Sequence, residues 1–302
     1  MSGPQARLLP GGRRLHLSHG PIDLIVEAWG RPDEVETSYR QAAARFRTVL
    51  DELVAELPAL RQPAGLTPRA FQGSTAQRME AAVAPHARKF ITPMAAVAGA
   101  VADESLAALL AGRRLAKAYV NNGGDVGLHL SPGEGLTLAV VGTGGRDRIS
   151  LCADQPSRGV ATSGWPGRSF SLGIADAVTV LAADASSADA AATVIANAVD
   201  LPGHPAVRRQ AACEITPDSD LGERPVTLGV GALSADEIAA ALDAGLRVAE
   251  GLRRRALIHA AALFLKGEAR VCRSEMTGMV MGSAPLAAAR PFRNGFSGQA
   301  RE

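Results

Sequence analysis

The alternation of hydrophobic and polar residues predicts two strands and then a long amphipathic helix at the start of the chain. Residues 13–17 and 22–29 alternate as strands do, with a short turn between them. From Pro32 to about Leu57 the apolar residues recur every three or four positions, as on one face of a helix. Pro58 is expected to end this helix. A hairpin followed by a helix is therefore predicted for this part of the chain.

Further helices and strands follow without the regular strand–helix–strand order of a doubly wound fold, so we predict the α+β class, with mixed or antiparallel sheets and flanking helices. The helical patterns cover 74–85, 93–110, 186–199 and 234–250, with Thr92 and Ser186 or Ser187 expected as N-caps. The strand patterns cover 115–120, 126–130, 135–141, 147–152, 177–183, 225–230 and 257–272. No linker-like composition divides the chain, so we expect one domain over 1–285 and a loosely packed tail over 286–302.

The composition is that of a soluble globular protein. Of 302 residues 47% are hydrophobic and 21% are charged, and the net charge is +2. This balance, with 4% aromatic residues, argues against a nucleic-acid surface. We find neither an uninterrupted apolar stretch of membrane-spanning length nor the apolar core of a signal peptide, so a cytoplasmic location without membrane contact is expected. The three cysteines are scattered, which speaks against a disulfide framework or a thiolate metal site.

The stretch Asn121-Asn122-Gly123-Gly124-Asp125 carries more turn-forming residues than one hairpin needs. Glycines permit positive φ and close approach of a ligand, and consecutive backbone N–H groups can bind an anion. The two asparagine amides could bond the polar edge of a flat ring, with Asp125 fixing the turn. The alternative is a hairpin turn without a ligand.

A second small, hydroxyl-rich stretch is Ala161-Thr162-Ser163-Gly164, at the end of an apolar strand. Thr162 and Ser163 could donate to a phosphate or to a flavin-type ring, although a strand that ends in a serine turn would have the same sequence.

Asp189 and Thr193 stand four residues apart near a predicted helix start, and so share one face. A carboxylate and a hydroxyl are hard oxygen ligands that suit Mg²⁺, which often binds substrate phosphates as well. The alternative is an acidic residue favoured by the helix dipole and a threonine bonded to its own helix.

In their order along the chain these stretches resemble the ApbE family of flavin transferases, which move FMN from FAD onto a threonine of a target protein with Mg²⁺. The matching segments are Asn122 to Asp125, Ala161 to Gly164, Ala188-Asp189 with Thr193, and in part 98–103 (AGAVAD), over about residues 90–200. The resemblance implies that 121–125 and 161–164 contact FAD or FMN, that Asp189 and Thr193 hold Mg²⁺, and that Asp189 is catalytic.

Two departures from the family pattern bear on the chemistry. The lysine and tyrosine of the family's helix motif are Ala98 and Ala100 here, which removes a positive charge suited to a diphosphate. The family's His-x-x-Asp-Pro-x-Thr-Gly segment is replaced by residues 168–176 (RSFSLGIAD). The chain is thus more similar to an ApbE-related subfamily that shares this last segment.

Three further residues are candidates for the missing roles. Asp176 lies where the absent segment would be and is a second catalytic candidate. Arg168 could bind a phosphate through two parallel hydrogen bonds, or could be a solvated loop charge. His129 is a minor candidate for a base, since a histidine on a strand is more often structural.

The leading interpretation is a flavin- or nucleotide-binding protein that, if catalytic, transfers FMN from FAD to a protein acceptor with Mg²⁺. One alternative is a flavin or cofactor carrier without catalysis, which Ala98 and Ala100 favour. Another is an enzyme that acts on a different phosphorylated ring substrate, such as a pterin.

Overall fold

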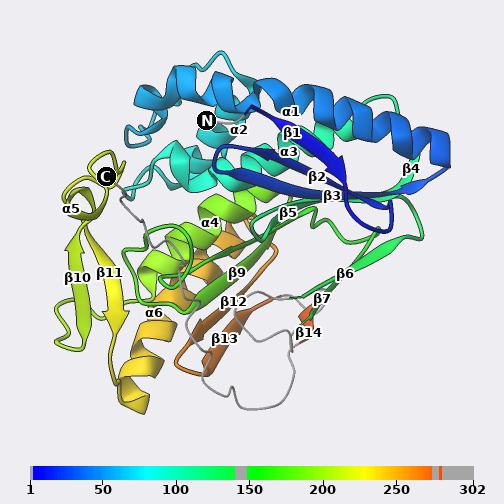
Figure 1. Cartoon of the computed structure of the whole chain (residues 1–302). Helices are drawn as coiled ribbons and strands as arrows, with labels where there is room; N and C mark the ends of the chain where they lie inside the picture. Colours follow the sequence, from blue (N-terminus) through cyan, green and yellow to red (C-terminus); the bar gives the residue numbers. More distant parts are fainter. Residues whose placement is uncertain (1–2, 140–147, 274–278, 281–302) are drawn as a thin grey trace.

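The computed structural model describes residues 3–139, 148–273 and 279–280, arranged as Figure 1 shows. The predicted domain boundary at 285 and the tail 286–302 lie outside the described residues. The helices are α1 (Pro32–Leu60), α2 (Ser74–Val83), α3 (Val97–Leu110), α4 (Ala185–Ala198), α5 (Ala212–Ile215) and α6 (Ala235–Arg254), with the 3-10 helices η1 (Ala84–His86) and η2 (Pro93–Ala96). The strands are β1 (Gln5–Leu8), β2 (Arg14–His19), β3 (Ile22–Gly30), β4 (Leu115–Asn122), β5 (Asp125–Leu130), β6 (Gly135–Ala139), β7 (Arg148–Cys152), β8 (Gly159–Ser163), β9 (Ala177–Ala182), β10 (Val207–Ala211), β11 (Pro225–Val230), β12 (Ala260–Leu265), β13 (Glu268–Cys272) and β14 (Met279–Val280).

One nine-stranded sheet organises the chain, in the order β1-β2-β3-β4-β5-β8-β9-β12-β13. Every neighbouring pair in it is antiparallel. A two-stranded sheet joins β10 to β11, and a three-stranded sheet has the order β14-β7-β6. Helices combined with antiparallel sheets confirm the predicted α+β class.

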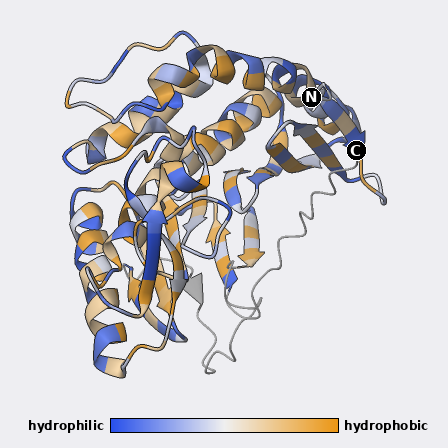
Figure 2. Cartoon of the chain, turned by 60° about the vertical axis from the view of Figure 1, so that its left-hand side comes forward, coloured by the Kyte–Doolittle hydropathy of each residue, from blue (hydrophilic) through white to orange (hydrophobic). Residues whose placement is uncertain are grey.

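Helices cover one face of the large sheet, and the small sheet of β6 and β7 packs on the other. Helices α1 and α3 share a hydrophobic core with β2, β3 and β4, and α4 and α6 share another with β8, β9 and β12. On the opposite face Ile149 and Leu151 of β7 pack against Val126 and Leu128 of β5. Figure 2 shows hydrophobic and hydrophilic residues alternating around the helices, as helices that cover a sheet require. We call the two sides of the large sheet the helix face and the hairpin face.

Four strand predictions were wrong or incomplete. The short strands β1, β10 and β14 were not predicted, because β1 has only four residues on the sheet edge, β10 carries two arginines and β14 has only two residues. The segment 257–272 is two strands, not one. Lys266 and Gly267 turn the chain between β12 and β13 with φ of +49° and +89°.

Two predicted helix ends were wrong, and a third lies where it was predicted but lacks a side-chain cap. Pro58 does not stop α1, which continues to Leu60, and the Arg61 N–H beyond it still donates to the Leu57 carbonyl. Thr92 stands at the N-cap of η2, as predicted, but its hydroxyl donates to Asp220 and not to the backbone of the helix. The N-cap of α4 is Asp184, whose carboxylate accepts from the Ser187 N–H at 2.7 Å.

Helices α3 and α4 cap each other's N-termini. The Asp103 carboxylate of α3 accepts from the backbone N–H groups of Ala185 and Ser186, at 3.0 and 2.8 Å, at the start of α4. In return Asp189 of α4 accepts from the N–H of Gly99 in α3 at 3.0 Å. Each carboxylate meets the positive end of the other helix's dipole. This exchange fixes the relative position of the two helices that carry the 98–103 and 188–193 motifs.

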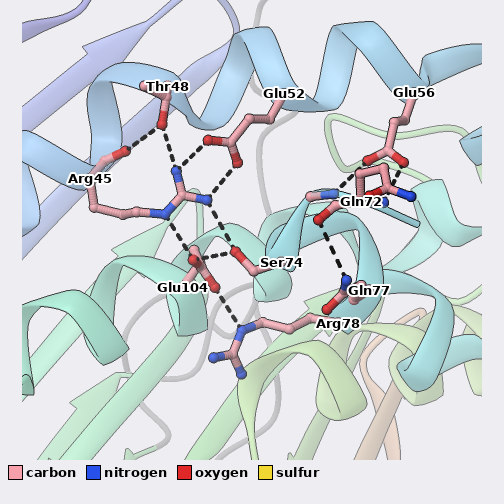
Figure 3. A network of polar contacts seen from close by, with 10 residues as sticks. Arg45, Thr48, Glu52, Glu56, Gln72, Ser74, Gln77, Arg78 and Glu104 are labelled. Carbon is pink, nitrogen blue, oxygen red and sulfur yellow. Dashed lines mark hydrogen bonds and ion pairs between the residues drawn. The ribbon is translucent and has the colours of Figure 1, made fainter. Parts of the chain in front are cut away.

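A polar network joins α1, α2 and α3 on the outer side of this layer (Figure 3). The buried Glu104 carboxylate accepts from Arg45 Nε at 2.8 Å, from Ser74 Oγ at 2.6 Å and from Arg78 Nε at 2.9 Å. Arg45 also forms a two-bond pair with Glu52. Burial alone would raise the pKa of Glu104, but these three donors outweigh it and lower that pKa. Glu104 is thus a charged, fully bonded junction of three helices.

The stretch Pro93–Leu110, formed by η2 and α3, is long and apolar enough by length and composition to cross a membrane. Of this stretch 61% is buried inside the protein, as in the core helix of a soluble domain.

Candidate functional site

The turn at 121–125 joins β4 to β5. Gly123 and Gly124 have φ of +65° and +118°, which glycine adopts without strain. The Asn121 Oδ1 atom accepts from the Gly124 N–H at 2.8 Å. Asn121, and not Asp125 as predicted, therefore fixes this turn through its side chain.

The two asparagines point to opposite faces of the sheet, because neighbouring residues of a strand alternate. Asn122 lies on the helix face, is buried, and donates its amide to the Ala98 carbonyl at 3.1 Å. Asn121 pairs with Val126 in the register and so lies on the hairpin face. The two amides thus cannot serve the edge of one ring together.

A cavity of about 290 Å³ lies on the hairpin face, beneath β6. The residues that line it are Asn121, Gly124, Val126, Leu138, Ala139, Val160, Thr162 and Thr179. The hydroxyls of Thr162 and Thr179 lie 2.9 Å apart on its floor. We call this cavity the slot. Its apolar walls, small volume and few polar groups suit one flat ring system at the small end of known ligand sites.

Two carboxyl groups adjoin the same turn on the helix face. Asp125 Oδ1 accepts from the Thr162 N–H at 3.1 Å, beyond the point where the ladder between β5 and β8 ends. Burial raises the pKa of Asp125 to about 7. Burial also raises the pKa of Asp189 well above its usual range, and the neighbouring Asp125 charge raises it further. Two acidic groups placed this close are stable when they share a proton or adjoin a cation.

A metal site near this turn would need enough suitable ligand atoms close together. Within the described part of the chain no group of three or more His, Cys, Asp or Glu side chains is arranged to hold a metal ion. Asp189 and Thr193, one turn apart on α4, present hard oxygen atoms. Such a set suits Mg²⁺ only if water and ligand phosphates complete its coordination, as they commonly do. The residues therefore fit a metal that arrives with its phosphorylated ligand.

The other predicted residues of 161–164 lie around the end of β8. Ala161 is fully buried in the core of the helix face, and Ser163 is partly exposed. Gly164 packs so closely on the chain that a Cβ atom there would lie 2.5 Å from the Asp176 carbonyl oxygen. Of this stretch Thr162 alone lines the slot.

Asp176, the second catalytic candidate, holds a loop in place. Its Oδ1 accepts from the Trp165 indole at 3.2 Å, and its Oδ2 accepts from the Lys266 N–H at 2.6 Å. Both carboxylate oxygens thus have donors from the protein, which favours a structural role over a catalytic one.

The turn has a charged neighbour in Arg168. One guanidinium nitrogen of Arg168 lies 3.2 Å from the position that a Cβ atom of Gly123 would occupy. His129 has a structural partner, since its Nε2 lies 3.3 Å from the Ser131 hydroxyl.

The structure thus brings the four motifs to one end of the sheet but on opposite faces, where sequence reasoning expected a common cleft. It also adds Thr179 and the wall residues of β6, which were not predicted. A threonine inside the otherwise apolar strand 177–182 (AVTVLA) was the one signal for Thr179.

Comparison with known proteins gave several relatives. A UPF0280 protein of Methanothermobacter thermautotrophicus is 41% identical over 115 residues, or 37% of this chain and 44% of that protein. A UPF0280 protein of Methanopyrus kandleri is 37% identical over 177 residues, or 54% of this chain and 66% of that protein. The matched part is thus about half the length of these curated relatives, whose names state no activity.

Among solved structures, the ApbE protein from Thermotoga maritima aligns with 90% of this chain and 97% of its own, at 16% identity and a TM-score of 0.42. Residues 6–271 match the profile of an ApbE-related family with the description "AbpE bacteria". This match covers most of the chain, and the chain belongs to that family.

Proposed function

We propose that the protein binds a flavin-type nucleotide together with Mg²⁺, and that it transfers FMN from FAD to a hydroxyl group of a protein acceptor. Membership in an ApbE-related family supports a flavin-related role. The observation that carries the proposal is the meeting of two unlike sites at one turn. Gly124 lines the slot on one face, and Asp125 adjoins Asp189 on the other.

In this arrangement the ring occupies the slot and the phosphates pass the turn toward α4. The ladder between β5 and β8 consists of the pairs Val126–Val160 and Gly127–Gly159, so the strands separate at the end that carries Asp125 and Thr162. The ring would meet Thr162 and Thr179, and a phosphate-bound metal would be held by Asp189 and Thr193. Bound Mg²⁺ would polarise a phosphate oxygen.

The reaction needs a proton acceptor as well as a bound diphosphate. The acceptor's hydroxyl oxygen forms a bond to the FMN phosphorus, the bond from that phosphorus to the AMP oxygen breaks, AMP leaves, and the hydroxyl proton goes to a base. Asp125 is suited to this step at neutral pH because its pKa is raised to about 7. Asp125 is a better candidate for this base than Asp176, because Asp125 lies at the turn and both oxygens of Asp176 already accept from the protein.

The test is AMP formation from FAD with Mg²⁺ and a threonine-containing acceptor protein. We expect Mg²⁺-dependent AMP and a flavin-labelled acceptor from the wild type, and a loss of about a hundredfold or more in Asp189→Asn. Asp154→Asn, at an exposed carboxylate away from the turn, should behave as the wild type. If no AMP forms over a broad set of acceptors, the transferase proposal is wrong.

A flavin carrier is the second candidate, and Ala98 and Ala100 favour it. Ala100 is fully buried and Ala98 uses its carbonyl to hold Asn122, so neither position offers a charge or a ring to a dinucleotide. Flavin that co-purifies without AMP formation would identify the carrier. A pterin enzyme is the third, because the slot's volume of about 290 Å³ also suits a smaller ring. Tighter binding of a pterin than of riboflavin would favour it.

A further inference from the structure

Arg168 is a charged side chain at the edge of the site that has no partner among the described residues. It lies in the loop between β8 and β9 and is exposed. No hydrogen bond or ion pair joins its guanidinium to any described residue, whereas Arg45, Arg69 and Arg209 each pair with a carboxylate. An arginine held beside a glycine turn and left unpaired is available to an anion from outside the protein.

The loop that carries Arg168 is anchored on both sides, so this position is built into the fold. Before it, the Trp165 indole donates to Asp176 and the Gly167 N–H donates to the Gly164 carbonyl at 3.1 Å. After it, the Leu172 N–H donates to Asn197 Oδ1 of α4 at 2.9 Å. The loop thus spans from the end of β8 to the polar side of α4.

Gly123 makes room for the guanidinium. Any larger residue there would place a Cβ atom 3.2 Å from Arg168 Nη1, and φ of +65° disfavours other residues in any case. The guanidinium therefore lies directly beside the glycine backbone of the turn, where an anion could contact both. Asp125 and Asp189 adjoin the same turn on the helix face, so a phosphate there would meet the guanidinium on one side and, under the proposed function, the metal held by Asp189 on the other.

We infer that Arg168 binds a phosphate of the ligand over the Gly123–Gly124 turn, and that the ligand is a diphosphate ester rather than an uncharged ring. This inference rests on the proposed function in one respect, the position of the ligand at the turn, and it does not depend on which ring the ligand carries. The guanidinium supplies from the β8–β9 loop the charge that Ala98 cannot supply from α3. Its planar donors match two phosphate oxygens at once.

The experiment measures binding by calorimetry with Mg²⁺ present, for inorganic diphosphate, FAD and riboflavin. The variants are Arg168→Gln, Arg168→Lys and, as a control, Arg47→Gln, an exposed arginine of α1. We expect Arg168→Gln to weaken diphosphate and FAD by about tenfold to a hundredfold, as for a lost charged hydrogen-bond pair, and to leave riboflavin unchanged. Arg168→Lys should recover part of the loss, and Arg47→Gln should bind as the wild type.

The outcomes separate this inference from the proposed function. Equal binding of diphosphate by wild type and Arg168→Gln, or no diphosphate binding by the wild type, overturns the inference. Diphosphate binding that Arg168→Gln weakens, without binding of any flavin, supports the inference and overturns the flavin proposal. A second variant, Gly123→Ala, should displace the guanidinium and weaken diphosphate while circular dichroism shows a folded chain. Unchanged affinity in that variant would also count against Arg168.

Discussion

The contact between α3 and α4 at Gly99 gives the sharpest test of the fold around the site. A Cβ atom on Gly99 would lie 2.3 Å from the Ala185 carbonyl oxygen and 2.7 Å from the Ser186 nitrogen. Both are rigid backbone atoms, so Gly99→Ala has to move one helix by about 1 Å, from 2.3 Å to ordinary contact near 3.4 Å. Bonds of 3.0 Å from Gly99 to Asp189 and from Ala185 to Asp103 would be broken by that shift.

The cost follows from these two effects. Overpacking costs about 1–3 kcal/mol, and a lost helix cap costs about 1 kcal/mol. Together they predict that Gly99→Ala lowers the free energy of unfolding by about 3 kcal/mol. Urea denaturation followed by circular dichroism measures this value.

Gly251 provides a matched control in another helix. It lies in α6, where a Cβ atom would meet a single neighbour, the flexible end of Arg254 at 4.0 Å. Gly251→Ala should therefore stabilise the protein by about 0.5–1 kcal/mol. If the free energy of unfolding of Gly99→Ala lies within about 0.5 kcal/mol of the wild-type value, α3 and α4 are not in the close contact described. The paired caps would then lose their explanation.

Three further changes test other parts of the structure. Glu104→Gln should lower the free energy of unfolding by about 2–3 kcal/mol, because Arg78 and Arg45 lose a charged, buried partner. Glu36→Gln, in an exposed pair, should change it by less than about 0.5 kcal/mol. Equal effects of the two variants in urea denaturation would contradict the role given to Glu104. The folded-state pKa of Asp103 is raised to about 6 and that of Asp125 to about 7, so the folded chain retains protons that the unfolded chain releases above about pH 4. The stability contributed by these groups is present below that pH and is lost as the pH rises toward 7. Asp125→Asn should therefore flatten the change in urea midpoint between pH 5 and 7.5, and the control Asp154→Asn should not. An unaltered slope in Asp125→Asn would refute the raised pKa of Asp125. Thr179→Val should weaken riboflavin and FAD binding but leave diphosphate binding intact, since Thr179 lines the slot and not the helix face; a parallel loss of diphosphate would place both ligand parts on one face.

Much of the fold followed from periodicity, because long amphipathic helices such as α1 and α6 and buried strands such as β9 carry strong patterns. The helix and strand predictions that were wrong have physical causes. The edge strand β1 has only four residues, all exposed, so its alternation of polar and apolar residues is too short to predict a strand. Pro58 and Thr92 follow local rules that tertiary contacts override, as when the Thr92 hydroxyl finds Asp220 far along the chain.

The site shows the limit of motif reading more clearly. The sequence indicated the turn, Thr162 and Asp189 as places of interest, but not on which face of the sheet each side chain would lie. Asn121 and Asn122 are adjacent in sequence and serve opposite faces, which only strand register decides. The role of Asp103 as a cap for a helix 82 residues further along was likewise beyond any local pattern.

The paired capping of α3 and α4 also has a consequence for synthesis of the protein on the ribosome. The start of α3 receives its partner only when Asp189 has been made, 90 residues after Gly99. At about 5–20 residues per second, this leaves the helix incomplete for roughly 5–18 s. During that interval its apolar surface is open to chaperones, and a pause in translation before residue 189 would prolong the exposure.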